Sequence, residues 1–428
     1  MKILVVLPRF PYPMEKGDKL RAYHQIKGLQ AQGNEIVLFC LSHEHVRKEW
    51  KEAIHPYCSA IYVARLSKAG SLMRTLGALL HNRSLQTAYW CSSKARRLFQ
   101  QVEQRCKPDV VYNQMVRTMP IVQHSRHCKV MDFQDCLSLN MGRNMARYEI
   151  SRPDDEKPRS NKHYYCHKTS LRYFVYHYEF KNLRKLENQA FSLFDALTII
   201  SEPDRAALPS PRRREVHIVP NGVDVGFYRP KEEEKKFDVA FCGNMQYEPN
   251  IRTAVYLAMQ VMPLVWEERP EARLLIAGAT PVAEVWRLAS DRIEVWANVP
   301  DIRQCYASTK VFAAPMQSGS GLQNKLLEAM AMEIPCITSS LANSSLRAKA
   351  NGQEILVGDT PRQVARHILY LLGSQQQRDI LAENARHFVC THYTWQAANS
   401  TLNAILASAS SRTNDFASAP LSGMKNKS

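Results

Sequence analysis

The sequence predicts an α/β protein in which two domains each contain a parallel sheet covered by helices on both faces. Short runs rich in Val, Ile and Leu alternate with helical stretches in both halves of the chain. Such uninterrupted apolar runs indicate strands that are buried on both faces, as in doubly wound parallel sheets. A chain of 428 residues is also too long for one hydrophobic core, so two domains are expected.

The individual elements follow from the same pattern. "KILVVLP" predicts the first strand, a helix is expected over about residues 19–32, and "EIVLFCL" predicts the second strand. The later strands of the first half are predicted by "AIYVARL", "DVVYNQ", "KVMDFQD" and "ALTIISE". Those of the second half are predicted by "VHIVPNG", "FDVAFCGNM", "ARLLIAG", "IEVWANV", "KVFAAPM", "PCITSS" and "QEILVGD".

Composition indicates where the domains begin and end. The segment "PSPRRRE" (209–215) is the expected hinge, and the end of the chain is rich in Ser, Asn and Lys, which favours disorder. The predicted segments are an N-terminal domain (1–208), a C-terminal domain (209–390), a helix that crosses back to the first domain (391–407) and a disordered tail (408–428).

Several features indicate a cytoplasmic protein without a metal site. "MKILVVLPRF" holds only six apolar residues before its proline, too few for the core of a signal peptide. The eleven cysteines include no C-x-x-C pair, so reduced thiols in a reducing compartment are expected. A polar surface insertion is predicted at 151–172, and its two histidines and one cysteine lack metal-ligand spacing.

The net charge of +17 is concentrated in the first half of the chain. Residues 1–215 carry a net charge of +16 and residues 216–428 carry +1. This asymmetry suggests a partner surface, either an anionic membrane or nucleic acid. The stretch 65–107 combines nine Lys or Arg with Leu and Met at helical spacing, which is typical of an amphipathic helix on a membrane; two solvated helices packed on a domain are the alternative. Nucleic acid is not favoured, because the sequence lacks an aromatic stacking platform or a recognisable binding motif.

Candidate site residues follow the strands, because ligands of doubly wound proteins bind at the carboxyl ends of the strands. After the first strand, Gly17 and Asp18 open a helix that contains Arg21. A glycine there lets backbone amides approach a phosphate, although a simple turn is the alternative. Neither G-x-G-x-x-G nor G-x-x-x-x-G-K-[ST] occurs at a strand end, which disfavours NAD and P-loop nucleotide binding.

Three further loops carry polar residues at strand ends. Asp132 and Asp135 lie at a strand end in "MDFQDCLS", as catalytic carboxylates or helix caps. "VPNGVDVGFYRP" contains an Asn-Gly turn signal, for which a tight turn is sufficient. Gly243 and Asn244 end the strand "FDVAFCGNM".

The loop and helix "GSGLQNKLLEAMAMEIPCIT" (319–338) follow the strand "KVFAAPM". Lys325 and Glu328 lie three residues apart, so they share one helix face. A Glu–Lys pair on a solvated helix is one interpretation. Because the surrounding helix is almost entirely apolar, a charged pair that serves a ligand is favoured.

These motifs together resemble a known family. P-x-P-x-x-x-G-D-x-x-R near the start, "IVPNGVD", "FCGNM" followed by "PN", and "GLQNKLLEAMAM" occur in the order found in family-4 glycosyltransferases of GT-B fold. The sequence looks most similar to the sugar transferases of exosortase-linked bacterial exopolysaccharide clusters, over about residues 1–405.

The resemblance implies a retaining, metal-independent transferase that needs no cofactor. It implies two Rossmann-like domains that face each other across a cleft, the first for the acceptor and the second for a nucleotide-diphosphate sugar. The family's helix glutamate, here Glu328, holds the ribose, and glycine-loop amides around Gly17 and 319–322 face the diphosphate and sugar. A glycan or lipid-linked acceptor and a location on the inner face of the cytoplasmic membrane are expected.

The sequence also departs from the family pattern. Ser320 stands where a second glutamate is usual, Asn244 and Asn250 stand where Arg and Lys are usual, and the first-domain histidine falls near Gln134 or Asp135. Lys325 is therefore the expected cationic contact of the diphosphate. The predicted catalytic residues are Asp135 and Lys325, and the predicted donor-binding residues are Gly17, Asp18, Arg21, Gly243, Asn244, Gly319, Ser320, Gly321, Leu322, Asn324, Lys325 and Glu328. A non-catalytic module that binds nucleotide sugar or membrane, or a sugar-nucleotide epimerase, are the alternatives.

Overall fold

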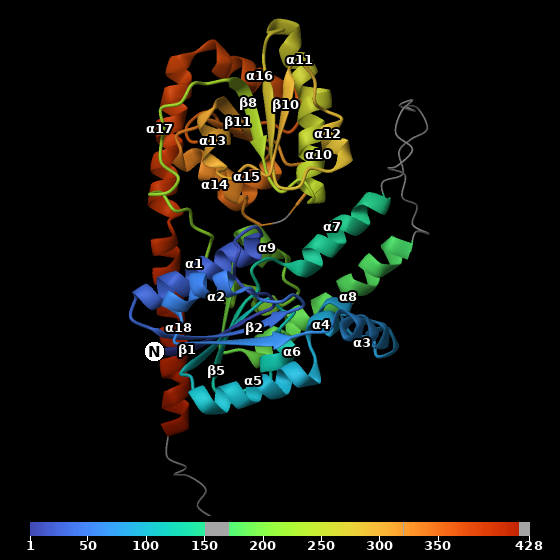
Figure 1. The fold of residues 1–428 in the computed structure, drawn as a ribbon, viewed down its shortest axis with the longest axis vertical. Coiled ribbons are helices and arrows are strands. Elements are labelled where there is room, and N and C mark those ends of the chain that lie inside the picture. The colour runs from blue at the N-terminus through green and yellow to red at the C-terminus, as the bar shows by residue number, and fades with distance from the viewer. Residues whose placement is uncertain (150–170, 320, 419–428) are drawn as a thin grey trace, which may run out of the picture. The chain divides into compact units, whose positions relative to one another are not determined.

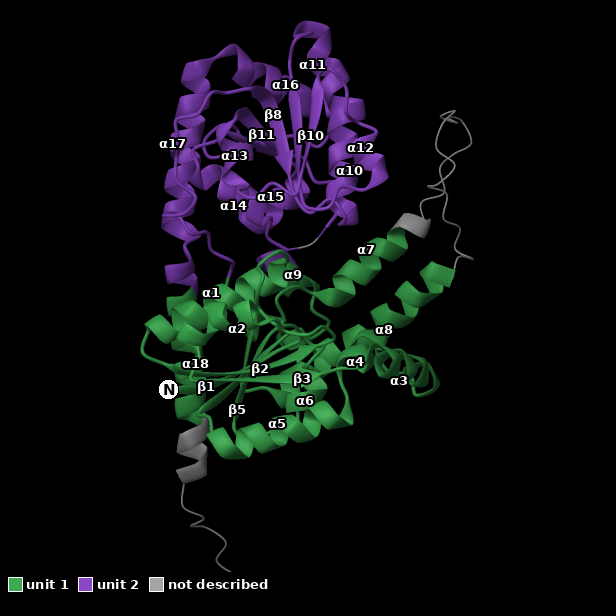
Figure 2. Cartoon of the chain, viewed as in Figure 1, with its two compact units in different colours: residues 1–200, 204–219, 399–428 green, residues 201–203, 220–398 purple. Residues whose placement is uncertain are grey.

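The computed structural model describes residues 1–149, 171–319 and 321–418 (Figure 1). They form two compact units, of which unit 1 comprises 1–200, 204–219 and the chain from 399, and unit 2 comprises 201–203 and 220–398 (Figure 2). Most of the predicted insertion at 151–172, as well as Ser320, lies outside the described residues.

Unit 1 contains a parallel sheet of seven strands in the order β3-β2-β1-β4-β5-β6-β7. Helices lie on both of its faces, with α1 and α2 on one and α5 and α6 on the other (Figure 1). The strands are β1 (Lys2–Leu7), β2 (Glu35–Ser42), β3 (Ala60–Arg65), β4 (Val110–Gln114), β5 (Cys128–Asp132), β6 (Ala196–Ile199) and β7 (His217–Ile218). The helices are α1 (Gly17–Ala31), α2 (Lys48–Ile54), α3 (Lys68–Leu80), α4 (Leu85–Trp90), α5 (Ser93–Cys106), α6 (Met119–Val122), α7 (Leu137–Glu149), α8 (Leu171–Leu193) and α9 (Glu202–Ala207).

The apolar runs form strands because both faces of this sheet are covered. In β1 all residues from Ile3 to Leu7 are buried, and the strand pairs with β2 on one side and β4 on the other. On one face Phe39 of β2 packs against Phe99 of α5, with ring centroids 5.6 Å apart. This burial explains why the strands lack the polar alternation of a half-solvated sheet.

Unit 2 contains a parallel sheet of six strands in the order β10-β9-β8-β11-β12-β13. In this unit α10 and α12 lie on one side of the sheet, and α14 and α17 on the other (Figure 1). The strands are β8 (Phe237–Cys242), β9 (Leu274–Gly278), β10 (Ile293–Ala297), β11 (Thr309–Ala314), β12 (Cys336–Thr338) and β13 (Leu356–Val357). The helices are α10 (Glu248–Tyr256), α11 (Met262–Glu268), α12 (Ala283–Trp286), α13 (Arg303–Ala307), α14 (Asn324–Ala331), α15 (Ser340–Leu346), α16 (Pro361–Gly373), α17 (Gln375–His392) and α18 (Trp395–Ser418), of which α18 continues into unit 1. The predicted pair of doubly wound sheets is confirmed.

The boundary between the units differs from the one expected at 208. The strand predicted by "VHIVPNG" is β7, and it pairs with β6 of the first sheet, Thr198 with His217 and Ile199 with Ile218. Residues 211–215, within the expected hinge, form a 3₁₀ helix of unit 1. Because a two-residue strand has no periodicity of its own, only the pairing decides to which sheet it belongs.

The last helix also differs from the expected segments. α18 extends to Ser418, through part of the tail that was predicted to be disordered. Most of α18 belongs to unit 1, where Asn399 donates to the carbonyl of His24 and Asn403 accepts from Asn34. Ala409 is completely buried, so small residues whose composition suggested disorder form a packed helix instead.

The basic stretch 65–107 forms the three helices α3, α4 and α5 and not two. α5 packs on the sheet, whereas five Leu and Met side chains of α3 are exposed: Leu72, Met73, Leu76, Leu79 and Leu80. Within the described residues, no helix is both long enough and apolar enough to cross a bilayer.

Candidate functional site

Each unit has a group of polar side chains where its central strands end. In unit 1 the group centres on Arg21 of α1 and Asp132, the last residue of β5. The Arg21 Nε lies 2.7 Å from Asp132 Oδ2, and its Nη2 lies 3.2 Å from Oδ1. Both side chains are buried, at 1% and 0% exposure. A charged pair this deep in the protein is tolerated because the two groups are matched in charge and geometry.

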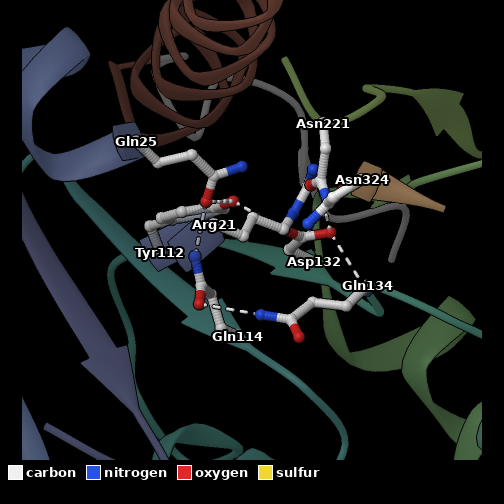
Figure 3. Close-up of polar contacts among 8 residues, drawn as sticks. All are labelled: Arg21, Gln25, Tyr112, Gln114, Asp132, Gln134, Asn221 and Asn324. Carbon is white, nitrogen blue, oxygen red and sulfur yellow. Dashed lines mark hydrogen bonds and ion pairs between the residues drawn. The ribbon is translucent and has the colours of Figure 1, made fainter. Parts of the chain in front are cut away.

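Amide and phenol groups extend the Arg21–Asp132 pair into a buried network (Figure 3). The Tyr112 hydroxyl lies 3.0 Å from both Asp132 Oδ2 and Gln25 Oε1. Gln114 donates to Gln25, and Gln134 donates to Gln114 over 3.0 Å. Burial together with the Asp132 charge raises the pKa of Tyr112 well above its usual value, so the phenol stays protonated and can donate. The Gln25 Nε2 is the one buried atom of this network without a hydrogen-bond partner among the described residues.

The start of α1 is open, in contrast to the network below it. Gly17 is exposed, and a Cβ atom built on it would meet nothing within 4 Å. Asp18 lies in the first turn and accepts a 2.9 Å hydrogen bond from Arg9. This turn can therefore offer amides to an anionic group, with the Asp18 charge offset by Arg9.

Asp135 lies between β5 and α7, two residues before the helix starts. It accepts a hydrogen bond from Asn140 over 2.8 Å. Next to it, Glu187 of α8 accepts hydrogen bonds from the Ser138 amide and hydroxyl, over 3.0 and 2.6 Å. Burial raises the pKa of Glu187 to about 7. Glu187 thus stabilises the first turn of α7 through Ser138. Asp135 differs from it in being only partly buried.

In unit 2 the polar group centres on Lys325, in the first turn of α14. Its Nζ lies 2.5 Å from the Asn250 side-chain oxygen and 4.6 Å from the centroid of the Phe241 ring. Burial lowers the pKa of Lys325 to about 8, while the Glu328 charge acts in the opposite direction. At neutral pH the ammonium thus keeps its proton while it lies in a poorly solvated place.

Glu328 also lies on α14, but its hydrogen-bond partner differs from that of Lys325. Its carboxylate accepts from the Tyr306 hydroxyl over 2.8 Å. Burial raises the pKa of Glu328, and the Glu328 charge in turn contributes to raising the pKa of Tyr228. The two charges of α14 therefore each have their own polar partner, which distinguishes them from a solvated Glu–Lys pair.

Gly243 directly follows β8 and lies beside Lys325. A Cβ atom at this position would lie 2.7 Å from the Asn250 side-chain nitrogen and 3.1 Å from the Lys325 Nζ. A Cβ on Gly278, at the end of the adjacent β9, would lie within bonding distance of the Gly243 carbonyl oxygen. A side chain at Gly278 would collide with backbone, and one at Gly243 would displace the Asn250 and Lys325 side chains.

The loop before α14 depends on glycine conformations. Gly319 has φ of +119° and Gly321 has φ of +71°, which disfavours any residue with a side chain at either position. Leu322 is buried, and Asn324 accepts a 2.9 Å hydrogen bond from Asn221 (Figure 3).

Asn221 and Gly222 belong to the "PNGVD" loop, which is held by contacts within unit 2. A Cβ on Gly222 would lie 2.2 Å from the backbone nitrogen of Trp395, and Asp224 accepts from the amides of Gly226 and Phe227. Asn244 holds its own loop in the same way, since its side chain accepts from the Gln246 amide. The sequence indicated turns here, and the structure shows which segments those turns contact.

Several residues of the two groups were not identified from the sequence. In unit 1 they are Gln25, Tyr112 and Gln114; in unit 2 they are Tyr228 and Tyr306. Tyr112 and Gln114 gave a weak signal, as polar residues at the end of an apolar strand run. In the described parts of the chain, no cluster of three or more His, Cys, Asp or Glu side chains is arranged to hold a metal ion.

Comparison with known proteins places this geometry in a class. Residues 236–374 match the family model described as glycosyl transferases group 1. Over 403 residues, the chain is 22% identical to an uncharacterized 44.6 kDa protein in the cps region of Klebsiella pneumoniae. This alignment covers 92% of this chain and 96% of that protein.

Two solved structures illustrate the fold. Sucrose-phosphate synthase of Thermosynechococcus elongatus superposes with a TM-score of 0.66 at 12% identity, over 97% of this chain and 100% of that chain. HepE of Anabaena, in complex with UDP and glucose, superposes with a TM-score of 0.66 at 13% identity, over 95% of this chain and 99% of that chain. The two parallel Rossmann-like sheets are thus those of the GT-B fold. With a group 1 glycosyltransferase domain in unit 2, the protein is a glycosyltransferase.

Proposed function

We propose that the protein is a retaining, metal-independent transferase of glycosyltransferase family 4. It moves a sugar from a nucleotide-diphosphate sugar to a glycan or lipid-linked acceptor during synthesis of the cell envelope or of exopolysaccharide. Support for a nucleotide-sugar donor comes from HepE, which was solved in complex with UDP-glucose. Support for the pathway comes from the relative in a cps region and from the resemblance to exosortase-associated transferases.

The observation that carries the proposal is the Lys325 ammonium beside Gly243. When the bond to the sugar breaks, negative charge develops on the departing nucleotide diphosphate, and preorganised donors are needed there. Lys325 is a cation at neutral pH, and its ammonium lies close to the end of β8, 3.1 Å from where a Cβ atom on Gly243 would be. Amides of the 319–322 loop and of the first turn of α14 are the proposed further donors, together with Asn244 and Asn324.

Glu328 is the proposed ribose ligand. A carboxylate accepts two hydroxyl protons in a fixed geometry, which suits the two neighbouring hydroxyls of a ribose. Tyr306 fixes one carboxylate oxygen over 2.8 Å. In unit 1 we propose Asp135 as a catalytic carboxylate and the amides of Gly17 and Asp18 as contacts of an anionic substrate group. Arg21, bound to Asp132, contributes by holding α1 in place.

The test begins with thermal-shift measurements of nucleoside diphosphates, followed by sugar transfer with the nucleotide that binds. Glu328→Ala should weaken donor binding at least about tenfold, because the ribose loses its acceptor. Glu383→Ala removes an exposed carboxylate of α17 in the same unit and should behave like the wild type.

Two results would contradict the proposal. Normal donor turnover by Glu328→Ala would remove Glu328 from the site. Donor binding without release of nucleoside diphosphate, with every acceptor tried, would favour a non-catalytic nucleotide-sugar-binding module.

We also propose that unit 1 attaches to the inner face of the cytoplasmic membrane. The net charge of residues 1–215 is +16, and α3 exposes Leu72 and Leu80 at 58% and 85%. Vesicles with anionic lipid should sediment the protein at low salt, and about 1 M salt should weaken the contact by screening. Absence of binding at low salt would contradict this attachment.

A further inference from the structure

Unit 1 contains a cavity of about 660 Å³ that is separate from its strand-end network. It lies among α3, α4, α5, α6 and α8, and none of Arg21, Gln25, Tyr112 or Asp132 lines it. A cavity of this volume holds a small organic ligand or a lipid headgroup.

The lining of the cavity carries positive charge and no negative charge. Arg74, Arg83, Arg96 and Lys185 line it together with His81, whereas neither Asp nor Glu is among its lining residues. No ion pair joins any of these four cations to a carboxylate in the described part of the chain. Within the described residues, their charge is therefore not neutralised by an ion pair.

Neutral groups hold the Arg74 side chain in place, whereas Arg96 has a buried N–H without a partner. Arg74 donates to the carbonyls of Ala88 and Tyr89 and to the Ser71 hydroxyl, all uncharged acceptors. The Arg96 Nε is buried and has no hydrogen-bond partner among the described residues. A buried guanidinium N–H without a partner is costly, so the site favours a ligand that accepts from it.

One acid, Glu179, contacts Ser84 in the lining of the cavity without being a lining residue itself. Glu179 of α8 is 3% exposed and accepts from the Ser84 hydroxyl and from the amides of Leu85 and Gln86, at the start of α4. It thus stabilises the first turn of α4. The cavity consequently keeps the net positive charge of its lining.

Opposite faces of α3 connect the cavity to the exposed apolar residues. Arg74 and Ala78 line the cavity, while Leu72, Leu76 and Leu80 are exposed, and at 3.6 residues per turn these sets lie on opposite sides of the helix. An amphipathic helix in a membrane interface buries its apolar face by about 5–10 Å and keeps the other face among the headgroups. If α3 lies in the interface in this way, the cavity is at the depth of the lipid phosphates.

We propose that this cavity binds the phosphate of an anionic phospholipid headgroup. Arg96 donates to phosphate oxygens, Arg74 and Lys185 add charge, and the acyl chains remain in the bilayer beside the apolar face of α3. The lipid source rests on the proposed membrane attachment. The phosphate chemistry rests on the cavity alone.

The first experiment separates the cavity from the bilayer. Dihexanoyl phosphatidylglycerol, used below its micelle concentration, should bind the full chain in calorimetry, whereas dihexanoyl phosphatidylcholine should bind more weakly. Arg96→Gln should weaken the former at least about tenfold through loss of a charge-assisted contact. Arg97→Gln removes an equal charge from an exposed neighbouring position of α5 that does not line the cavity, and it should have less than about a twofold effect.

A second variant separates this inference from membrane attachment. Leu76→Ser with Leu80→Ser should reduce sedimentation with phosphatidylglycerol vesicles and leave binding of the short-chain lipid unchanged. Circular dichroism of each variant checks that it folds.

Three outcomes would overturn the inference. Inorganic phosphate binding as tightly as the short-chain lipid would replace the lipid by a free phosphate ligand. If Arg96→Gln and Arg97→Gln weakened binding of the short-chain lipid equally, the effect would come from the net charge of the protein and not from the cavity. Vesicle binding without any binding of the short-chain lipid would leave the membrane attachment standing and remove the cavity from it.

Discussion

The two strand-end groups use the same fold position in different ways. In unit 1 the cation Arg21 is 1% exposed and fully matched by a carboxylate that is 0% exposed. In unit 2 the cation Lys325 is only partly buried, and its nearest partner is the neutral Asn250. A matched buried pair stabilises one conformation, whereas a cation with a neutral partner can still gain energy from an anion. From this difference we propose a structural role for the first group and a ligand role for the second.

The largest expected effect is the loss of stability when Arg21 is replaced. Arg21→Met leaves Asp132 buried without its cation, which should lower the free energy of unfolding of unit 1 by about 3–5 kcal/mol. Urea denaturation measures this loss. Lys48→Met removes a cation of unit 1 whose side chain is 86% exposed, and it should leave the denaturation midpoint nearly unchanged. Similar midpoints for the two variants would contradict a structural role for Arg21.

The corresponding test in unit 2 uses Gly243. In Gly243→Ala the new methyl group meets Asn250 and Lys325, which should weaken nucleoside diphosphate binding at least about tenfold and destabilise unit 2 by about 1–3 kcal/mol. Calorimetric titration and thermal unfolding measure the two effects. Gly373→Ala is the matched control, since a Cβ there meets nothing within 4 Å, and its stability should change by less than about 0.5 kcal/mol. Wild-type affinity in Gly243→Ala would mean that ligand and Gly243 do not share this space.

Unit 1 also contains a buried acid, Glu187, whose hydrogen-bond partners are neutral, in contrast to Asp132. The pKa of Glu187 is raised from 4.5 to about 7, so the folded state binds more protons than the unfolded state between these values, and this site loses stability as pH rises from 4.5 to 7. Glu187→Gln removes the titration; its amide oxygen can still accept from the Ser138 amide, and its NH2 group can donate to the Ser138 hydroxyl oxygen. Its stability relative to the wild type should therefore increase by about 2 kcal/mol between pH 5 and pH 8. A constant difference across a series of urea denaturations would show that Glu187 does not titrate in this range.

The smallest expected effect is the pH dependence of donor binding. Because the pKa of Lys325 is about 8, most of the ammonium is protonated at pH 7 and most is neutral at pH 9. Nucleoside diphosphate affinity should fall by up to about tenfold between these values, and the full fall is reached if the bound diphosphate keeps Lys325 protonated throughout this range. Lys325→Met should bind more weakly at pH 7 and lose this dependence. An unchanged dependence in the variant would assign the titration to another group.

The sequence predicted the strands well because most of their residues are buried. The continuous run from Ile3 to Leu7, for example, has no other explanation in a chain of this composition. The assignment of β7 to the first sheet was missed, because a strand of two residues is too short to show a hydrophobic periodicity. The tail was missed because burial of Ala409, which composition does not encode, turns a polar stretch into a helix.

The site was only partly accessible from the sequence. Lys325 and Glu328 stood out as charges on an apolar helix, and the glycines stood out as strand-end residues. Their partners did not, because Asn250 lies 75 positions before Lys325 and Tyr306 lies 22 positions before Glu328. Gln25 and Tyr112 looked like ordinary helix and strand residues.

The sequence by itself determined the alternation of buried strands and helices, the positions of the glycines and the uneven charge of the chain. All of these are local or compositional properties. Only the tertiary structure decided that Arg21 is matched by Asp132 while Lys325 is left beside a neutral amide. Hydrogen bonds and ion pairs between distant residues depend on how strands order themselves in a sheet, and that order is set by packing of the whole unit.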